Sequence, residues 1–410
     1  MGSIAEIYSG VARYLLRQPL IRKPWSFLRD QQLLRQYQAR REHYARLAQE
    51  KGLIYREPET IAKIRSRLRE RGYQPAARKM GEIHTGAFVP DMGWHCELLP
   101  DLRSLGPLTV FDYVAAGFRW DEFWKADRAG LARRRDMNER FFAALKAAHE
   151  ARPVDWVFVY ATGLEISAST VQRIMKELGI PTVNMCLDDQ QSWTGPFMGD
   201  HDAGQIGIAA AFDLAWTSAR VACEWYLVEG GRPLYMPEGF DASLYQPMQV
   251  EADIPISFIG GAYGFRPAVI QYLLKHGVPI RTYGHGWPHS HWAANTVEIF
   301  NRSMINLGMG GIGYAERLTN VKGRDFAVPG TGGGVYLTSF NPDLAQHFVV
   351  GEEILCYGHR DEMLELIRYY LNHADEAAAI AQRGRERCLR EHRWLHRYQK
   401  VLKIFGILDS

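Results

Sequence analysis

The sequence lacks the features that mark several special classes of protein. The 410-residue chain has no run of 18 or more apolar residues, so it contains no candidate membrane-spanning helix. Its five cysteines are scattered, with no C-x-x-C pair. That scatter argues against a structural zinc site or a disulfide framework and fits a reducing cytoplasm. The first residues also lack an apolar segment followed by a small-residue cleavage site, so we expect no signal peptide and a cytoplasmic protein.

The small net charge of +3 conceals an uneven distribution. Residues 1–80 hold 18 Lys and Arg against 7 Asp and Glu, a local charge of +11, and the remaining chain carries −8. Residues 1–75 therefore predict a basic helical extension, in which aromatic side chains such as Tyr8 and Trp25 mix with cations. This mixture is typical of a helix that lies at a membrane interface. We expect residues 1–50 to contact an anionic membrane surface, peripheral at its inner face. A solvated helical face and a helix packed on the body are the alternatives, and nucleic acid is not expected.

From about residue 81 the pattern changes to alternating strands and helices. Residues 156–160 and 181–187 are strand candidates, separated by a helix over 166–178 that stops at Gly179. Strands joined by single helices predict a parallel sheet. A polar stretch with two prolines, residues 241–255, interrupts the series before a second one begins. We therefore predict an α/β chain with domains over 76–245 and 246–410, the second including a terminal helix, and a ligand cleft between them.

Two turns in the second series have the composition of ligand-binding loops. In SFIGGAYGFR, residues 257–266, a strand enters a turn with Gly260 and Gly261 and then a helix. Glycines let the backbone approach a phosphate, and the helix start supplies N–H groups. No Gly-Lys-Ser/Thr follows, so this is no P-loop, and a purely structural turn is the alternative. The next strand ends in YGHGW, whose Trp287 we expect to line a nucleotide pocket.

The histidines after that strand do not predict a metal site. His285, His289 and His291 stand close together in the sequence, but no carboxylate or cysteine accompanies them. We expect no metal ion here.

A third segment pairs two cations with a glycine-rich turn. Lys322 and Arg324 lie two residues apart beside a predicted helix start, and PGTGGG then leads into a strand. Two cations with backbone N–H groups can neutralise a departing diphosphate. The alternative is a solvated basic pair before a flexible turn.

These segments together carry a resemblance to a known family. The run from Ile256 to about Arg397 resembles the CgeB-like, spore-maturation-protein-type glycosyltransferases of the GT-B fold, which belong to glycosyl transferases group 1. The matching elements, in order, are ISFIGGAYGFR, YGHGW, FNRSMINLGM, KGRDF with PGTGG and VYLT, FVVGEEILCYGHRDEMLELIRYYLNH and REHRWLHR. The amino-terminal half matches in outline only, through its βα units and MPEGFDASLY.

The resemblance implies two Rossmann-like domains, with a nucleotide sugar in the carboxyl-terminal one and an acceptor in the other. A UDP- or GDP-sugar would serve as co-substrate, without cofactor or metal, and a glycan, lipid-linked, protein or small-molecule hydroxyl would accept the sugar, as in polysaccharide biosynthesis. Lys322 and Arg324 would hold the diphosphate. The other donor-binding residues would be Gly260, Gly261, Arg266, Tyr283, Gly284 and Trp287 near base and ribose, and Gly332, Gly333 and Thr338 near sugar or phosphates.

One position departs from the family pattern. The family commonly reads Arg-x-Phe-Glu, with the Glu expected on the donor ribose, and this chain has Ala327 there. Asp325 or Glu316 would take its place, or the donor is held differently, or catalysis has been lost. The last case would make the protein a degenerate nucleotide-sugar-binding or structural protein; a GT-B nucleotide-sugar epimerase is a further alternative.

Candidate catalytic groups should come from the amino-terminal half, facing the cleft. Asp188 and Asp189 follow the strand over 181–187, and His84 and Asp91 flank the first strand. Any of these carboxylates or the imidazole would serve as base toward an acceptor hydroxyl, although Asp at such a place is also a frequent helix cap. Glu238, in MPEGFD, is expected near the hinge, facing the donor.

Overall fold

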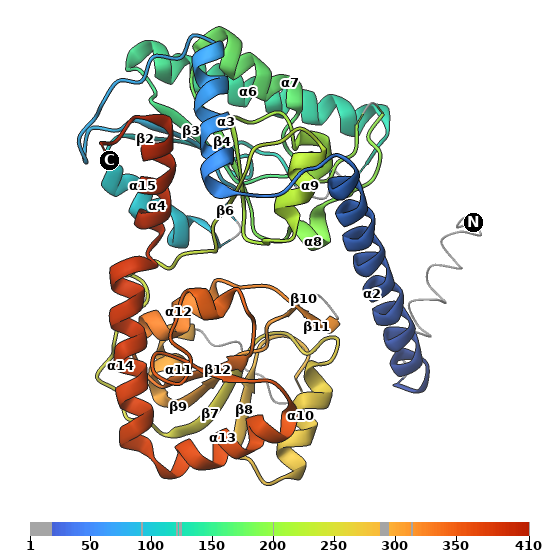
Figure 1. Ribbon diagram of the computed structural model, residues 1–410, viewed down its shortest axis with the longest axis vertical. Helices are drawn as coiled ribbons and strands as arrows, with labels where there is room; N and C mark the ends of the chain where they lie inside the picture. The colour runs from blue at the N-terminus through green and yellow to red at the C-terminus, as the bar shows by residue number, and fades with distance from the viewer. Residues whose placement is uncertain are drawn as a thin grey trace.

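The protein folds into two parallel β-sheets, each flanked by helices, as Figure 1 shows for this computed structural model. The structure describes residues 19–91, 93–119, 122, 125–199, 201–287, 295–312 and 315–409, with side chains from residue 31 onward except residue 317. The α/β prediction is confirmed. Tyr8, Trp25, His289 and His291 lie outside the described side chains.

The first sheet has the strand order β2-β1-β3-β4-β5-β6, and every neighbouring pair is parallel. Its strands are β1 (Thr85–Phe88), β2 (Leu108–Phe111), β3 (Trp156–Val159), β4 (Thr182–Cys186), β5 (Leu214–Thr217) and β6 (Pro233–Tyr235). Strands such as β3 are buried along their whole length, as expected for a parallel sheet covered on both faces.

Helices cover both faces of this sheet. They are α3 (Glu57–Glu70), α4 (His95–Leu105), α6 (Arg128–Ala151), α7 (Ala168–Arg173) with its π-turn η1 (Ile174–Leu178), α8 (Asp189–Ser192), η2 (Gln205–Ile208) and α9 (Ala222–Val228). Local chemistry sets several ends. Asp127 caps α6 by accepting from the backbone N of Gly130 at 2.8 Å, and Gly179 ends η1 in the left-handed region.

The second sheet has the order β13-β12-β9-β7-β8 and is also parallel throughout. Its strands are β7 (Ile254–Ile259), β8 (Ile280–Tyr283), β9 (Ser303–Leu307), β12 (Val335–Ser339) and β13 (Leu355–Tyr357), with a separate hairpin of β10 (Gly311–Ile312) and β11 (Ala315–Thr319). Its helices are α10 (Arg266–Lys275), α11 (Thr296–Arg302), α12 (Arg324–Thr331), η3 (Leu344–Gln346), α13 (Arg360–Asn372) and α14 (Ala374–Glu391).

The last helix, α15 (Trp394–Phe405), leaves the second sheet and packs on the first (Figure 1). We expected this helix in the carboxyl-terminal domain. Its buried face is apolar and joins the core cluster of α3 and α4, where Trp394 and Tyr398 are almost completely buried. Arg393 adds an ion pair to Asp101 of α4, with 2.7 Å between Nη2 and Oδ1. The chain therefore crosses between the sheets twice.

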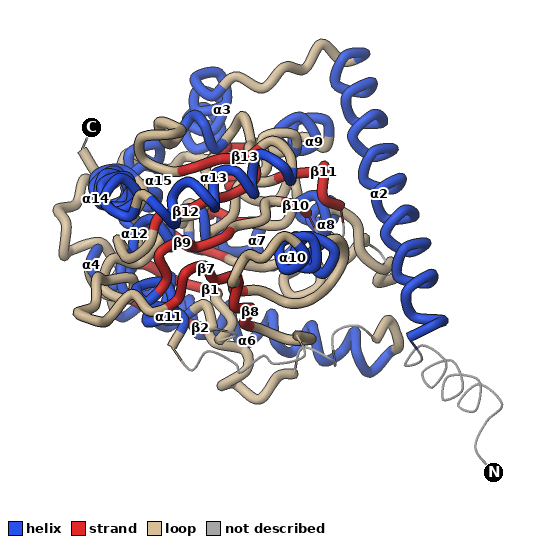
Figure 2. The backbone as a smooth tube through the Cα atoms, turned by 90° about the horizontal axis from the view of Figure 1, so that it is seen from below, coloured by secondary structure: helices blue, strands red, loops and turns tan. Residues whose placement is uncertain are grey.

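The basic extension also packs against the rest of the protein. Helix α2 (Pro19–Glu50) runs through Pro24 and lies along one side of the molecule, beside the β10–β11 hairpin (Figure 2). Tyr44 is buried against Trp193 and Trp225. Arg40 donates to the backbone oxygen of Gln190 at 2.9 Å, so at least this part of the helix faces protein. Among the helices that the structure describes, none is long and apolar enough to cross a membrane.

We predict that Tyr44→Ala destabilises the protein by about 3–5 kcal/mol, because it empties an aromatic cluster and removes the partner of Trp193 and Glu229. Gln49→Ala, an exposed position of the same helix, should change the free energy of unfolding by no more than about 0.5 kcal/mol. Chemical denaturation of both variants checks this. Equal stabilities would show that α2 does not belong to the folded body.

Candidate functional site

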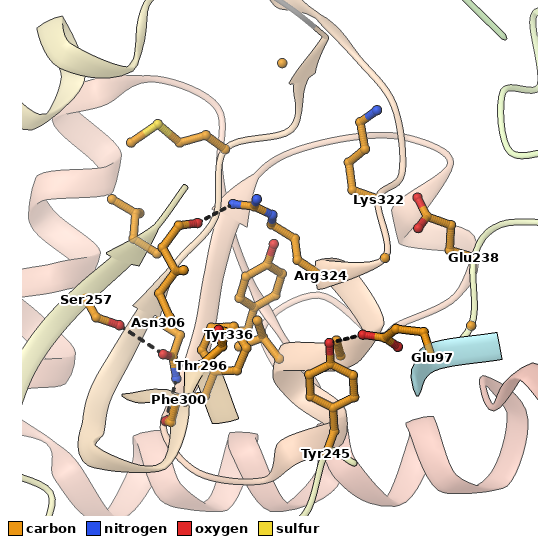
Figure 3. Close-up of a pocket in the computed structure, with 18 of the residues that line it drawn as sticks. Glu97, Glu238, Tyr245, Ser257, Thr296, Phe300, Asn306, Lys322, Arg324 and Tyr336 are labelled. Carbon is orange, nitrogen blue, oxygen red and sulfur yellow. Dashed lines mark hydrogen bonds between the residues drawn. The ribbon is translucent and has the colours of Figure 1, made fainter. Parts of the chain in front are cut away.

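A cavity of about 480 Å³ lies between the two sheets, and residues from both halves line it (Figure 3). Helix α4, the start of α8, the crossing segment 238–245 and α15 form one side. The other side includes the ends of β7 and β9, the starts of α10 and α12, and residues of α11, β10 and β12. Strand order in the second sheet reverses between β7 and β9, and ligands of such sheets bind beyond the carboxyl ends at this point.

Two cations enter the cavity from the start of α12. Asp325 stabilises the turn that carries them, because its carboxylate accepts from the Lys322 backbone N at 2.7 Å and from the Tyr336 hydroxyl at 2.6 Å. Arg324 donates to the Ile259 backbone oxygen at 3.0 Å, which orients the guanidinium beside β7 (Figure 3). Lys322 Nζ lies 2.6 Å from Asp188 Oδ1, so an ion pair joins the two halves across the cavity.

A third cation, Arg266, begins α10 and is 6% exposed. Its guanidinium lies over the Tyr263 ring, 4.2 Å from the centroid, and its Nε has no hydrogen-bond partner in the described part of the chain. Burial, and then the nearby Arg324, lower the pKa of Arg266 to about 10, so it stays charged at neutral pH. Two neighbouring arginines at a cavity wall favour a polyvalent anion between them.

Glu238 lies beside these cations and is almost fully buried. Burial raises its pKa to about 8, against the lowering effect of Lys322. At neutral pH the side chain is therefore mostly a neutral acid that can donate a hydrogen bond, rather than an anion that would repel a phosphate. The chain approaches it closely at Gly323, where a Cβ would lie 2.5 Å from Glu238 Oε2.

Glu97 is a cavity-lining carboxyl that we did not predict from the sequence. It lies on α4 and accepts a hydrogen bond from the hydroxyl of Tyr245 in the crossing segment (Figure 3). Burial raises its pKa to about 7, and the hydrogen bond from Tyr245 opposes that rise. No motif surrounds Glu97, and only its place one helix after β1 could have indicated it.

Residues 266–403 match the protein family described as glycosyl transferase-like. The chain carries a glycosyltransferase domain. The prediction of a glycosyltransferase is thereby confirmed. The match covers the three cations, four of the five strands of the second sheet (β8, β9, β12 and β13, but not β7) and most of α15.

Solved structures agree on the fold. A glycosyltransferase from Rickettsia africae ESF-5 is 8% identical, with a TM-score of 0.51 over 79% of this chain and 97% of that one. Anabaena Alr3699/HepE, solved in complex with UDP and glucose, is 9% identical, with a TM-score of 0.49 over 78% of this chain and 99% of that one. At 8% identity the likeness to the Rickettsia glycosyltransferase shows the fold alone, which is GT-B. A comparison with curated proteins found no match.

Of the catalytic candidates, the structure brings Asp188 to the glycosyltransferase cavity but not Asp189 or His84. Asp189 is fully buried and accepts from the hydroxyls of Thr217 at 2.5 Å and Tyr226 at 2.7 Å, which ties α8 to β5 and α9. His84 precedes β1, so it lies at the amino ends of the strands, away from the cavity. Its ring is hydrogen-bonded to Thr109 and to the Arg152 backbone oxygen. The side chains of Asp188 and Asp189 point in different directions, although the residues are adjacent, because α8 begins between them.

Asp91 follows β1, so it lies at the carboxyl ends of the strands of the first sheet, as the cavity does, but on the protein surface. Its carboxylate, His95 Nδ1 or Nε2 and the Asp112 carboxylate have ligand atoms within 4.8 Å of one another, which is the spacing of cation ligands. Asp91 is exposed, however, and His95 Nε2 is taken by the Val89 backbone oxygen at 2.8 Å. No part of this cluster lines the cavity.

The glycines and the Trp of the two predicted donor loops do not line the cavity, but they pack against residues that do. Trp287 donates to the Gly260 backbone oxygen at 2.7 Å, and Gly260 donates to the Tyr283 oxygen at 2.8 Å. Gly284 has φ of 116° and passes so close that a Cβ would lie 2.7 Å from the Gly260 oxygen. Gly261 accepts from the cavity-lining Arg266 at 3.3 Å. These residues position Arg266 and the end of β7.

The turn with Gly332 and Gly333 does not reach the cavity. Gly332 ends α12 with φ of 71°, and a Cβ on Gly333 would lie 2.6 Å from the Phe300 backbone oxygen. Both lie at the amino end of β12, while the cavity lies at the carboxyl ends of the strands. Thr338 is buried within β12 and is absent from the cavity lining.

Ala327, where the family commonly has Glu, lines the cavity. Asp325 points away into the turn, and Glu316 pairs on the surface with Arg360 at 2.8 Å. Neither lines the cavity, whose carboxyls in the described chain are Asp188, Glu97 and Glu238.

We predict that the affinity of this glycosyltransferase domain for a nucleoside diphosphate falls by about tenfold as pH rises from about 7 to 9. Glu238, with its pKa of about 8, loses its proton over this range and adds a negative charge beside Lys322. Glu238→Gln should flatten the dependence, and Glu316→Gln, a surface control, should keep it. Isothermal titration calorimetry across the range measures it; a parallel decline in Glu238→Gln would contradict the assignment.

Proposed function

We propose that the protein transfers a sugar from a nucleoside diphosphate sugar, a UDP- or GDP-sugar, to a hydroxyl acceptor, without a bound metal. The observation that carries the proposal is the set of Lys322, Arg324 and Arg266 at one wall of the cavity, inside the glycosyl transferase-like region. Three cations can neutralise a diphosphate without a metal ion. The neutral acid Glu238 adds a hydrogen-bond donor to the same wall.

The cations would act on the leaving group. As the bond between the anomeric carbon and the diphosphate breaks, negative charge grows on the phosphate oxygens, and cations already in place stabilise that charge. Lys322 is engaged by Asp188 in the structure, so a bound diphosphate would compete with this carboxylate for the ammonium group. Donor binding would thus exchange one ionic partner of Lys322 for another.

The acceptor would enter from the amino-terminal half, where Trp94 and Glu97 line the cavity. The closer affiliation with CgeB-like glycosyltransferases, and an acceptor such as a growing polysaccharide, belong to this proposal. Ala327 favours one second candidate, a protein that binds the nucleotide sugar and does not transfer it, because the carboxylate expected at the donor ribose is missing.

A donor panel separates the candidates. Calorimetry with UDP-glucose, UDP-galactose, UDP-N-acetylglucosamine and GDP-mannose identifies the donor, and release of UDP or GDP with and without sugar acceptors shows turnover. EDTA should leave both unchanged. Binding without any turnover would establish the second candidate, and binding of none of these compounds would reject both.

We predict that Arg324→Ala weakens UDP binding by roughly 10- to 100-fold, the loss expected for about 1.5–3 kcal/mol of charge-assisted hydrogen bonding. Arg360→Ala removes a surface arginine that pairs with Glu316 away from the cavity, and serves as the matched control. Calorimetry with UDP measures both. Wild-type affinity in Arg324→Ala would remove this residue from the diphosphate site.

We also propose peripheral binding to an anionic membrane, now through residues 1–30. This segment has five Lys and Arg against two Asp and Glu, whereas Arg40 and Arg41 further along bond to the body. Deleting residues 1–30 should weaken sedimentation with phosphatidylglycerol vesicles, because each basic residue near such a surface contributes about 1 kcal/mol. Neutral phosphatidylcholine vesicles are the control. Equal sedimentation of both proteins would refute the membrane role.

A further inference from the structure

One wall of the cavity holds polar groups that the donor-binding residues do not use. They come from the amino-terminal side: Glu97 on α4, Tyr245 on the crossing segment and Trp394 at the start of α15, with the Trp94 ring beside them. Figure 3 shows Glu97 and Tyr245 pointing toward one another, apart from Arg324. None of these residues belongs to the cation pair of Lys322 and Arg324.

Trp394 presents a hydrogen-bond donor without a partner. The side chain is 1% exposed and lines the cavity, and its Nε1 makes no hydrogen bond within the described residues. The indole N–H is directed at Glu97 closely enough for hydrogen bonding to lower the pKa of that carboxyl, although the pair falls short of full hydrogen-bond geometry. Buried indole N–H groups nearly always have a partner, and a ligand oxygen placed between the indole and the carboxyl would supply one.

Glu97 presents an acceptor at the same place. The Tyr245 hydroxyl bonds its Oε1, while Oε2 takes part in no hydrogen bond between described residues. A donor and an acceptor side by side are complementary to one alcohol, whose oxygen accepts from the indole and whose proton points to the carboxylate. A charged acceptor group would not satisfy both.

We propose that Trp394 and Glu97 bind the hydroxyl of a neutral sugar or polyol acceptor, and that Glu97 takes its proton. The proposal rests on the function proposed above and names the acceptor's place in it. Trp94 contributes an aromatic surface at the same wall, suited to the apolar C–H face of a sugar ring. Tyr245 is a positioning residue, since it holds the carboxyl of Glu97.

The acceptor oxygen forms a bond to the anomeric carbon of the donor, and the bond from that carbon to the diphosphate breaks. The electron pair of the broken bond leaves with the phosphate oxygen, near Lys322 and Arg324. The acceptor proton passes to the Glu97 carboxylate, which later releases it to water.

The other carboxyls of the cavity are less suited to this role. Asp188 is engaged by Lys322, and Glu238 is mostly protonated at neutral pH beside the same cation. Glu97 has a pKa of about 7, so a large fraction is ionised near neutral pH. The titratable groups facing it are Tyr245 and Asp241 of the crossing segment, Cys96 of α4 and Tyr398 of α15, and no cation pairs with it in the described chain.

The test compares Glu97→Gln, Glu97→Asp and Trp394→Phe with the surface control Glu316→Gln. The donor is whichever nucleotide sugar binds most tightly in the panel above, and the acceptors are water and methyl β-D-glucopyranoside. Glu97→Gln should slow both hydrolysis and transfer by about 100-fold while donor affinity stays within about twofold. Trp394→Phe should raise KM for the glucoside with a smaller change in kcat. Glu97→Asp should recover part of the rate.

The pH profile distinguishes a base from a structural residue. The wild-type rate should rise with pH through about 7 as Glu97 ionises, and Glu97→Gln should lose this rise. A wild-type rate or profile in Glu97→Gln overturns the proposal, as does a wild-type protein that binds the donor yet neither hydrolyses nor transfers it. Absence of donor binding by the wild type instead rejects the proposed function. Glu97→Gln keeps the shape of the side chain, so the test stands even if Trp394→Phe fails to fold.

Discussion

The packing of α15 on the first sheet is the interaction on which the rest of the architecture depends. The chain builds the second sheet, then returns to bury Trp394, Tyr398 and their neighbours among α3, α4 and the strands. This return ties together two halves that a single crossing would leave free to separate. It also brings an indole N–H to the cavity wall, so the residue that closes the core contributes to the candidate site. Helix α2 adds a second fastening along the side of the molecule, between α9 and the β10–β11 hairpin.

The cavity between the sheets gathers charges of both signs in a partly dry space, and each half supplies mainly one sign. The cations Lys322, Arg324 and Arg266 belong to the second sheet, while Glu97 and Asp188 belong to the first, with Glu238 on the crossing. Burial makes this arrangement sensitive to protonation, because the pKa values of Glu97 and Glu238 rise into the neutral range. A ligand that is anionic at one end and carries hydroxyls at the other matches such a division.

The sequence was most informative where chemistry is local and repeats along the chain. Strand runs such as 156–160, glycines at helix ends and the spacing of Lys322 and Arg324 depend on neighbours a few residues away, and the parallel α/β fold follows from them. The sequence predicted less well the role of residues that depend on a partner far away in the chain. Asp189 and His84 have suitable side chains, yet hydrogen bonds to Thr217, Tyr226 and Thr109 turn them away from the cavity. Glu97 carries no motif, and its position emerges only when Tyr245 and Trp394 pack beside it.

The sequence by itself determined the α/β class, the two series of strands and helices, and a basic pair suited to a diphosphate in a glycosyltransferase-like region. These features arise from periodicity, turn residues and ordered motifs, all of which are encoded within short stretches. Tertiary structure alone decided that α2 and α15 fasten the two halves, and that Glu97 joins Asp188 and Glu238 as the carboxyls at the cavity while Asp189 and His84 do not. The physical reason is that burial and long-range packing, which set exposure, partner and protonation, arise between residues hundreds of positions apart.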